Sequence, residues 1–594
     1  VTGVQTCALP ISAANDVLLN SGKLTAGSVY MPLREDGKIG SGAIVQQDTH
    51  SIITDKLYAA ATQGIALSSS NNELQNVDLW NAGKGDIRLT NNGGKDLNVI
   101  VEEVNNGNIT VVNNIQGDIN VQSALEAAGD IAVTNKAGSV HLAQDATVTT
   151  YYHGEQDVDK AAAAGGDITV TSAGTINSGK TLTAEQNIVL QAENGITING
   201  SVNAQAGGVT ANTKTGGISF AGDVGAGTDV SATTEKGSIG YGSKVTAGEN
   251  VTVTTGTGDI TFDSTVNSGK NISLQTDSGS MEINSQVIAA NGDISLVINT
   301  QGDIFDANDN KGSLSAINGN TTITNNGFGD IDLDKIYALD NVRVELTDGS
   351  LRLYEINGRL VAVALRSEGH TMDIDNTVAS TQILLNGSSM DLDDIEQRVN
   401  GDGMLVITPS GASGDKPIDT LSIGGLTTNS GIYFEHLWVK NADISIDGGK
   451  MILDKLFVED KAQFTNKGMV TTVYGTTPIW DGSNSVYWQN TAKNRPEQNL
   501  NAWLNGTGDW MYLNFAEQKG VQHSNGLLLH LQDHYYVYDQ RFSGVGHLRY
   551  LSGDALASGY ELEYIPGLHH YNRFDNYELP EFAEHAAEDE LRIE

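Results

Sequence analysis

Three consecutive segments share one length and one pattern: VSATTEKGSIGYGSKVTAGEN (230–250), VTVTTGTGDITFDSTVNSGKN (251–271) and ISLQTDSGSMEINSQVIAANG (272–292). Each begins with an aliphatic residue and contains two further short apolar stretches. The repeat length of about 21 residues is typical of a solenoid. Three apolar stretches per repeat, separated by turns rich in Gly and Asn, indicate three short strands. The sequence therefore predicts an all-β protein, a right-handed parallel β-helix (β-solenoid) with about 21 residues per rung.

The apolar positions form three series that recur at a nearly constant step of about 21 residues. These series are Ile188, Val209, Val230, Val251 and Ile272; Ile196, Ile218, Ile239, Ile260 and Met281; and Val202, Val224, Val245, Val266 and Val287. Apolar residues mostly alternate with small polar ones, as in Val251-Thr252-Val253, so residues i and i+2 share a face. We therefore expect Val251 inside the coil and Thr252 outside it.

A glycine precedes most members of the second series by two residues. These glycines are Gly216, Gly237, Gly258 and Gly279. Glycine is the residue that most readily adopts a positive φ, so each is expected to form a corner of the coil.

The repeat defines the expected domain organisation. Residues 12–474 are assigned to one β-helical shaft of roughly 20 rungs, with the cleanest repeats at 166–304. None of the eight prolines lies between Pro32 and Pro409. This supports the assignment, because interior strands must donate their N–H groups to the next rung. The segment 151–164 interrupts the period and is expected to loop out from a corner.

The first eleven residues, VTGVQTCALPI, resemble the translation of a sequencing adapter joined to an open reading frame. We interpret residues 1–11 as an artefact of this kind, which would make Cys7, the only cysteine, foreign to the natural protein. A natural N-terminal segment would then be missing.

The last fifth of the chain, residues 475–594, differs in composition. It holds 18 of the 36 aromatic residues and seven of the 12 histidines. We assign it to a separate C-terminal module with an acidic tail. Such a module would cap the exposed strand edges of a solenoid or present an aromatic ligand face. The candidate binding residues are Trp480, Trp488, Trp503, Trp510, Tyr535, Tyr536 and Tyr538.

The net charge of −39 bounds the possible partners. A nucleic-acid-binding protein needs a basic footprint, so the charge argues against nucleic acid and against anionic membranes. No run of 18 apolar residues is present, and the sequence predicts no transmembrane segment. No cofactor-binding motif was found, and we expect no cofactor.

Recurrent Gly-Asp-Ile units, together with TQGIALSSSNNEL at 62–74, carry a family likeness. They resemble the shaft repeats of filamentous haemagglutinin-type exoproteins, and the aromatic C-terminal part is most similar to the leukotoxin-type filamentous adhesins of two-partner secretion. This resemblance implies export through an outer-membrane transporter barrel of a Gram-negative bacterium. It also implies a secreted or surface-bound location and attachment to a glycan or protein receptor on host cells, matrix or other bacteria.

Two other functions remain as alternatives. A β-helix can be the scaffold of a polysaccharide lyase or hydrolase, but such enzymes need clustered carboxylates in a cleft. Rungs of about 21 residues leave little room for a cleft, and the titratable residues do not converge in the sequence. We therefore expect a protein that is not an enzyme. An exported cytotoxin or contact-dependent toxin in 475–594 is the other alternative.

Two weaker ligand patterns were considered. Asp306, Asn308 and Asn310 resemble a calcium loop, but the glycine lies one residue late for the EF-hand pattern, so an Asx-rich turn is favoured. Outward hydroxyls at 210, 231, 252 and 273 would form a ladder. Ice-binding solenoids use paired threonine columns, whereas only Thr252 and Thr254 complete such a pair in this stretch.

Overall fold

The computed structural model is built from β-strands alone, and the part of the chain that it describes contains no helix. The chain forms two compact units, Val1–Asn299 and Thr300–Glu594. Both contain a parallel β-solenoid, with about 16 turns in all. Backbone and side chains are described, apart from a few isolated positions, for residues 16–31, 42–102, 107–142, 160–307 and 311–396, and elsewhere only strand backbones are described.

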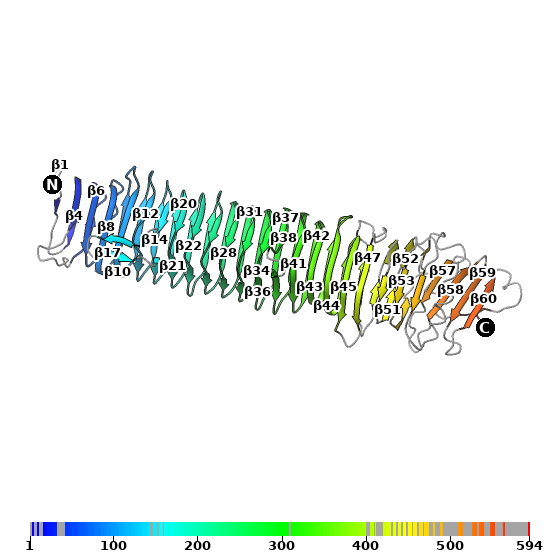
Figure 1. Cartoon of the computed structure of the whole chain (residues 1–594). Helices are drawn as coiled ribbons and strands as arrows, with labels where there is room; N and C mark the ends of the chain where they lie inside the picture. Colours follow the sequence, from blue (N-terminus) through cyan, green and yellow to red (C-terminus); the bar gives the residue numbers. More distant parts are fainter. Residues whose placement is uncertain are drawn as a thin grey trace. The chain divides into compact units, whose positions relative to one another are not determined.

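Parallel pairing stacks the strands of the first unit in three columns, each strand lying beside its counterpart one turn later (Figure 1). The first column contains β3 (Val17–Leu19), β5 (Ile44–Gln46), β7 (Ile65–Leu67), β9 (Ile87–Asn91), β11 (Ile109–Asn113), β14 (Ile131–Asn135), β19 (Ile168–Ser172), β22 (Ile188–Ala192), β25 (Val209–Thr213), β28 (Val230–Lys236), β31 (Val251–Thr257) and β34 (Ile272–Ser278).

The second and third columns contain shorter strands. The second contains β12 (Ile119–Val121), β15 (Val140–Leu142), β20 (Thr175–Ser178), β23 (Gly195–Ile198), β26 (Ile218–Phe220), β29 (Ile239–Tyr241), β32 (Ile260–Phe262) and β35 (Met281–Ile283). The third contains β13 (Leu125–Ala127), β18 (Lys160–Ala164), β21 (Thr181–Ala184), β24 (Val202–Ala204), β27 (Val224–Ala226), β30 (Val245–Ala247), β33 (Val266–Ser268) and β36 (Gln286–Ala289).

Near the N-terminus one long strand per turn replaces these two short ones. The long strands are β4 (Gly22–Met31), β6 (His50–Ala61), β8 (Glu73–Lys84) and β10 (Leu97–Asn106), and β10 pairs with both β12 and β13. The strand backbones β1 (Gly3–Val4) and β2 (Leu9–Pro10) pair with β4.

The register confirms the predicted series. Val230 pairs with Val251 and Val251 with Ile272, and the other two series pair in the same way. Val251 is fully buried, whereas Thr252 is exposed. The apolar series therefore form continuous buried stacks inside the coil, as the alternation predicted.

Close approach to the preceding turn leaves no room for a side chain at any of the four corner glycines, and three of them also have a positive φ. Gly237, Gly258 and Gly279 have φ values of 142°, 143° and 149°, as predicted. Gly216 does not have a positive φ, and in this respect the prediction was wrong. A Cβ at Gly216 would lie 1.6 Å from the carbonyl oxygen of Asn194 in the preceding turn. Close approach of the backbones therefore excludes a side chain there.

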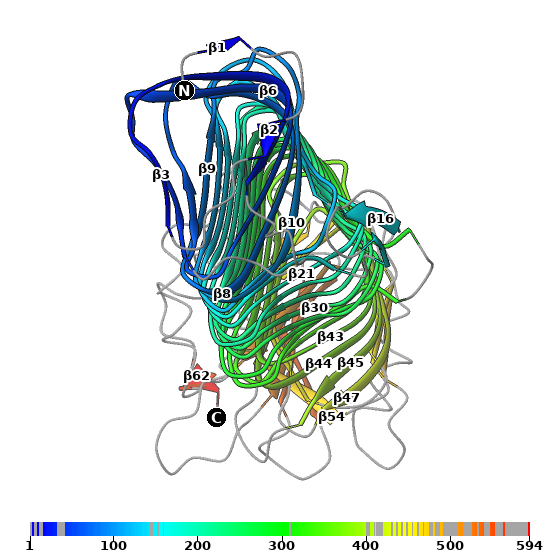
Figure 2. The ribbon, with the colours of Figure 1, turned by 90° about the vertical axis from the view of Figure 1, so that its left-hand side faces the viewer.

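The predicted insert at 151–164 is present, but it begins before residue 151 and ends before the alanines. β16 (Thr147–Thr150) and β17 (Gly154–Asp157) form an antiparallel hairpin outside the columns (Figure 2). The alanines that follow do not loop out, because they belong to β18 and are buried in the third column. The turn that contains the hairpin extends from Ile131 to Ile168, a step of 37 residues.

Longer strands build the second unit. They are β40 (Thr321–Phe328), β41 (Ile331–Ala338), β42 (Asn341–Asp348), β43 (Leu351–Leu365), β44 (Thr371–Asn386), β45 (Ser389–Gln397), β46 (Met404–Thr408) and β47 (Thr420–Thr428). The first half of β43 pairs with β41 and its second half with β42, so one strand serves two columns.

Further strand backbones continue the parallel pattern in three small sheets. The last of these strands are β54 (Met469–Val473), β55 (Ile479–Trp480) and β56 (Tyr487–Asn490). They are followed by an antiparallel sheet of β57 (Asp509–Asn514), β58 (Asn525–Leu531), β59 (His534–Asp539) and β60 (His547–Ser552).

Candidate functional site

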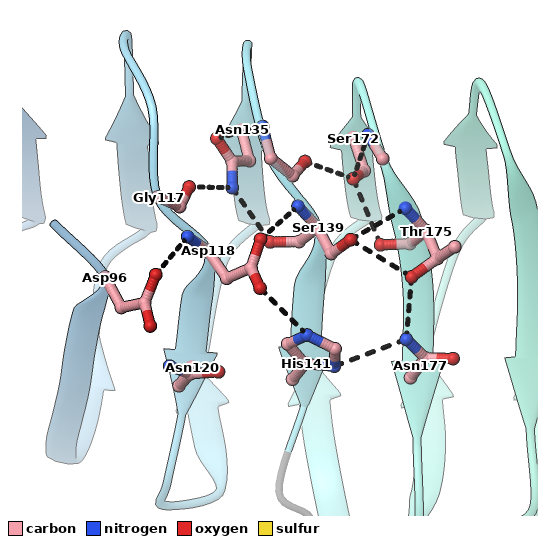
Figure 3. A network of polar contacts seen from close by, with 12 residues as sticks. Asp96, Gly117, Asp118, Asn120, Asn135, Ser139, His141, Ser172, Thr175 and Asn177 are labelled. Atoms are coloured by element: carbon pink, nitrogen blue, oxygen red, sulfur yellow. Dashed lines mark hydrogen bonds and ion pairs between the residues drawn. The ribbon is translucent and has the colours of Figure 1, made fainter. Parts of the chain in front are cut away.

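Polar side chains at the corner before the second column link successive turns (Figure 3). The backbone N–H of Asp118 donates to Asp96 Oδ1 at 2.9 Å, and that of Ser139 donates to Asp118 Oδ1 at 2.7 Å. Thr175 continues the ladder by donating its N–H to Ser139 Oγ at 3.1 Å. Each corner residue thus accepts a hydrogen bond from the turn that follows, which satisfies backbone groups that the strands leave unpaired.

His141 lies beside this ladder, between two polar side chains (Figure 3). Its Nε2 is 3.6 Å from Asp118 Oδ2, and its Nδ1 is 3.2 Å from Asn177 Nδ2. The hydroxyl of Ser139 is hydrogen-bonded to Thr175 Oγ1 at 3.1 Å. These contacts join three successive turns, and we interpret this network as a device that holds the turns in register.

The outer side of the first column carries regular rows of outward side chains. From β14 to β34 the first-column strands have five to seven residues and at least two outward positions each, whereas most strands of the other two columns have three residues and one outward position. We define the uncharged face as the first two outward residues of each of the strands β14, β19, β22, β25, β28, β31 and β34. They are Ala132, Thr134, Thr169, Thr171, Val189, Gln191, Thr210, Asn212, Ser231, Thr233, Thr252, Thr254, Ser273 and Gln275.

None of these fourteen residues is charged, and twelve carry a hydroxyl or a carboxamide group. The pairing between these strands has no register shift, so Thr210, Ser231, Thr252 and Ser273 form one straight row. Strand geometry puts neighbouring turns about 4.8 Å apart and the two rows about 6.7 Å apart. Thr169 and Thr171 form a second Thr-x-Thr pair on this face, in β19, outside the stretch in which the sequence revealed one.

Charged residues border the uncharged face without entering it. Lys214 Nζ lies 3.7 Å from a Glu193 oxygen and Lys270 Nζ lies 2.9 Å from a Glu249 oxygen, each pair joining neighbouring turns. Beyond the two rows, β28 also exposes Glu235 and Lys236 and β34 exposes Asp277, so the lack of charge is confined to the two rows. The face can form many hydrogen bonds but no ion pair.

The second unit carries a different surface, which we define as the acidic stripe: Asp373 and Asp375 on β44, and Asp391, Asp393 and Asp394 on β45. Asp373 pairs directly with Asp391, and on its other side with Arg352. Burial raises the pKa of Asp373 above its ordinary value, and the charges of Asp375 and Asp391 raise it further. The stripe thus contains a carboxyl group that holds its proton more tightly than usual.

The sequence analysis did not anticipate this convergence of carboxylates, and in this respect it was wrong. The signal was present in the sequence, as MDIDNT at 372–377 and MDLDDI at 390–395. The step between these segments is 18 residues, shorter than the period of the first unit. The two segments therefore do not align at the period of the first unit.

Of the predicted calcium loop, only Asp306 lies among the described residues, since Asn308 and Asn310 fall outside them. Asp306 Oδ2 accepts hydrogen bonds from the backbone N–H groups of Lys311 at 2.5 Å and Gly312 at 2.6 Å. Its carboxylate closes the turn, in agreement with the favoured interpretation. Among the described side chains, no group of three or more His, Cys, Asp or Glu residues could hold a metal ion.

The predicted aromatic candidates are described only as strand backbones. Trp480 lies in β55, Trp488 in β56, Trp510 in β57, and Tyr535, Tyr536 and Tyr538 in β59. Register places Trp510 opposite Leu529, Leu529 opposite Tyr536, and Tyr536 opposite Tyr550. Trp503 lies outside the described residues, as do the side chains of the other six candidates. The predicted aromatic ligand face therefore stays a prediction.

No protein-family model matches the chain, and no curated protein or solved structure is significantly similar to it. Within the described residues no helix is long and apolar enough to cross a membrane. Function therefore has to be inferred from the surfaces of this chain.

Proposed function

We propose that this chain is part of the shaft of a secreted filamentous adhesin, which is exported across the outer membrane of a Gram-negative bacterium and attaches to host cells, matrix or other bacteria. The observation that carries the proposal is the uncharged face, a regular hydrogen-bonding surface repeated over seven strands. The resemblance of the Gly-Asp-Ile repeats to filamentous exoproteins supports the same function.

The physical reason is multivalency. A single hydroxyl or carboxamide exchanges a hydrogen bond to water for one to a ligand, and each exchange contributes only about 0.5–1.5 kcal/mol. A repeated surface adds many such contacts to one large receptor, so its total affinity can exceed that of any single contact. Attachment to an extended partner suits this arrangement better than capture of a small molecule does.

The test is binding of the purified full chain to epithelial cells and to immobilised matrix proteins, beside an unrelated protein of similar negative charge. We expect saturable binding by this chain and not by the comparison protein. Equal binding by the two proteins, or no saturation by either, would overturn the adhesin proposal.

The acidic stripe favours a second candidate, a polysaccharide-degrading enzyme. Glycoside hydrolysis uses a pair of carboxyl groups, one of which keeps its proton as a general acid. Asp373, with its raised pKa, would be that acid and Asp391 the carboxylate beside it. The test is release of sugars from a polysaccharide panel by the full chain, and its loss in Asp373→Asn. No release from any polysaccharide would exclude this candidate for that panel.

A further inference from the structure

We propose that the uncharged face binds a neutral polysaccharide whose chain lies along the axis of the coil. This inference rests on the proposed adhesin function and adds the chemical class of the receptor. It follows from three properties of the face: its lack of charge, the chemistry of its groups and the spacing of its rows.

The lack of charge selects the class of polymer. A ligand of high negative charge would be repelled by the chain as a whole, whose net charge is −39. A positively charged ligand would be drawn away from the two rows, to the carboxylates of Glu235 and Asp277 that border them or to the acidic stripe. A neutral ligand avoids both effects. Two copies of this chain would repel each other, which disfavours a second copy as the occupant.

The groups on the face match those of a sugar. Serine and threonine hydroxyls and the carboxamides of Asn and Gln both donate and accept hydrogen bonds. Sugar hydroxyl and acetamido groups do the same, so either partner can supply the donor at each contact. Thr210, Ser231 and Thr252 offer one hydroxyl per turn in one row, and Thr233 and Thr254 continue the second row beside it.

The spacing matches a polymer laid lengthwise. Each turn advances the face by about 4.8 Å, close to the advance of one extended β-1,4-linked pyranose unit. One sugar unit would then lie against each turn. Because neighbouring units of such a polymer face opposite ways, equivalent groups of the polymer would meet a row at every second turn. Because every contact is weak, binding should require a long ligand, and short oligosaccharides should compete poorly.

The experiment is cosedimentation of the full chain with cellulose and with chitin fibres, with immobilised polygalacturonate as the charged comparison. We expect saturable binding to at least one neutral fibre that persists in high salt, little binding to polygalacturonate and no competition by cellotriose. Binding to neither neutral fibre, or equally good binding to polygalacturonate, would overturn the inference. Sedimentation without fibres would indicate self-association and would overturn it as well.

Two variants locate the surface. Thr252→Glu puts a charge on the uncharged face, whereas Thr246→Glu puts the same charge on the third column one turn earlier, and both residues are exposed. We expect Thr252→Glu, combined with Thr210→Glu, to weaken fibre binding at least tenfold and Thr246→Glu to leave it unchanged. Equal effects would contradict the inference. Cell binding that persists without fibre binding would overturn the neutral-polysaccharide receptor alone, whereas loss of both would overturn the adhesin proposal too.

Discussion

Thr255 Oγ1 donates a hydrogen bond of 2.8 Å to the carbonyl oxygen of Gly237 in the preceding turn. Thr234 and Thr276 make the same bond to Gly216 and Gly258, at 3.0 and 3.1 Å. The threonines are buried at the end of the first-column strands, where the inner row changes from apolar to polar. The corner glycine therefore supplies the acceptor, and the buried threonine the donor, of a hydrogen bond that links successive turns.

Replacing Thr255 with Val keeps the shape and removes the donor. Because the carbonyl of Gly237 would lose this partner, we expect local destabilisation of about 1–3 kcal/mol. Hydrogen exchange measured by mass spectrometry on the full chain should show faster exchange in peptides covering 230–262. Thr255→Ser keeps the hydroxyl and serves as the control. Equal acceleration in both variants would show that lost packing, rather than the hydrogen bond, is responsible.

Substitutions at Val251 and Thr252 test which side of the first-column strands faces the inside of the coil. Val251→Asp places an unpaired carboxylate in a fully buried apolar stack and should cost several kcal/mol. Thr252→Asp places the same group in solvent and should change stability by about 0.5 kcal/mol or less. Thermal unfolding followed by circular dichroism should separate the two variants clearly. Similar melting temperatures would contradict the assignment of the two sides.

Tyr241 carries a hydroxyl group in an apolar stack. Its ring lies between those of Phe220 and Phe262, with centroid distances of 5.3 and 5.1 Å. The hydroxyl is buried without a hydrogen-bond partner, and burial raises the pKa of Tyr241 well above its ordinary value. Tyr241→Phe removes the unsatisfied group, and we expect it to stabilise the surrounding turns by about 1–3 kcal/mol.

Hydrogen exchange in the same peptides should slow in Tyr241→Phe. Phe262→Tyr, which adds a second hydroxyl to the stack, is the matched control and should speed exchange. Faster exchange in Tyr241→Phe would show that the hydroxyl contributes to stability.

The acidic stripe predicts a pH dependence of the second unit. The raised pKa of Asp373 means that the folded state holds this proton to a higher pH than the unfolded chain, whose carboxyl titrates near 3.8. The stability associated with this proton is complete below pH 3.8 and is lost as the pH rises through the folded-state pKa. Asp373→Asn should therefore stabilise β44 and β45 at pH 7 and have little effect in acid, as measured by hydrogen exchange. A variant less stable than the wild type at pH 7 would contradict this.

Glu345 predicts the opposite sign in the same unit. Burial alone would raise the pKa of Glu345, but hydrogen bonds from Arg343 and Arg366 together lower it below 4.5. The Arg366 Nη2 atom lies 2.9 Å from a Glu345 oxygen. The stability that ionised Glu345 contributes is present above pH 4.5 and is lost as the pH falls through its lowered pKa. Glu345→Gln should therefore destabilise β42 at pH 7 and much less at pH 3, which hydrogen exchange at the two pH values would measure.

Most of the fold could be predicted from the sequence because one period repeats. The burial of Val251 could be predicted because Val251 alternates with Thr252 and occupies the same repeat position as Val230 and Ile272. The pattern makes Gly216 equivalent to Gly237, Gly258 and Gly279, so it cannot show that Gly216 alone of the four lacks a positive φ. It also cannot show the close approach to the preceding turn that excludes a side chain at all four, which is a property of the stacked backbones.

The surfaces were less predictable than the core. A row of hydroxyls at 210, 231, 252 and 273 follows directly from the period, but the lack of charge across seven strands is seen only when both outward rows are aligned. The pairing of Asp373 with Asp391 could not be predicted from the period of the first unit, because the repeat at these residues of the second unit is shorter. Register, rather than residue type, decides which carboxylates meet.

The parallel pairing of the first unit has a consequence for how such a chain can change in evolution. Each strand bonds only to its counterparts in the turns before and after it, so no strand closes the coil and no geometric rule fixes the number of turns. Duplication or deletion of one whole repeat preserves every neighbour relationship. An insertion of another length must leave the wall, as the hairpin of β16 and β17 does. A gain or loss of whole repeats would therefore change the length of the shaft without changing its fold.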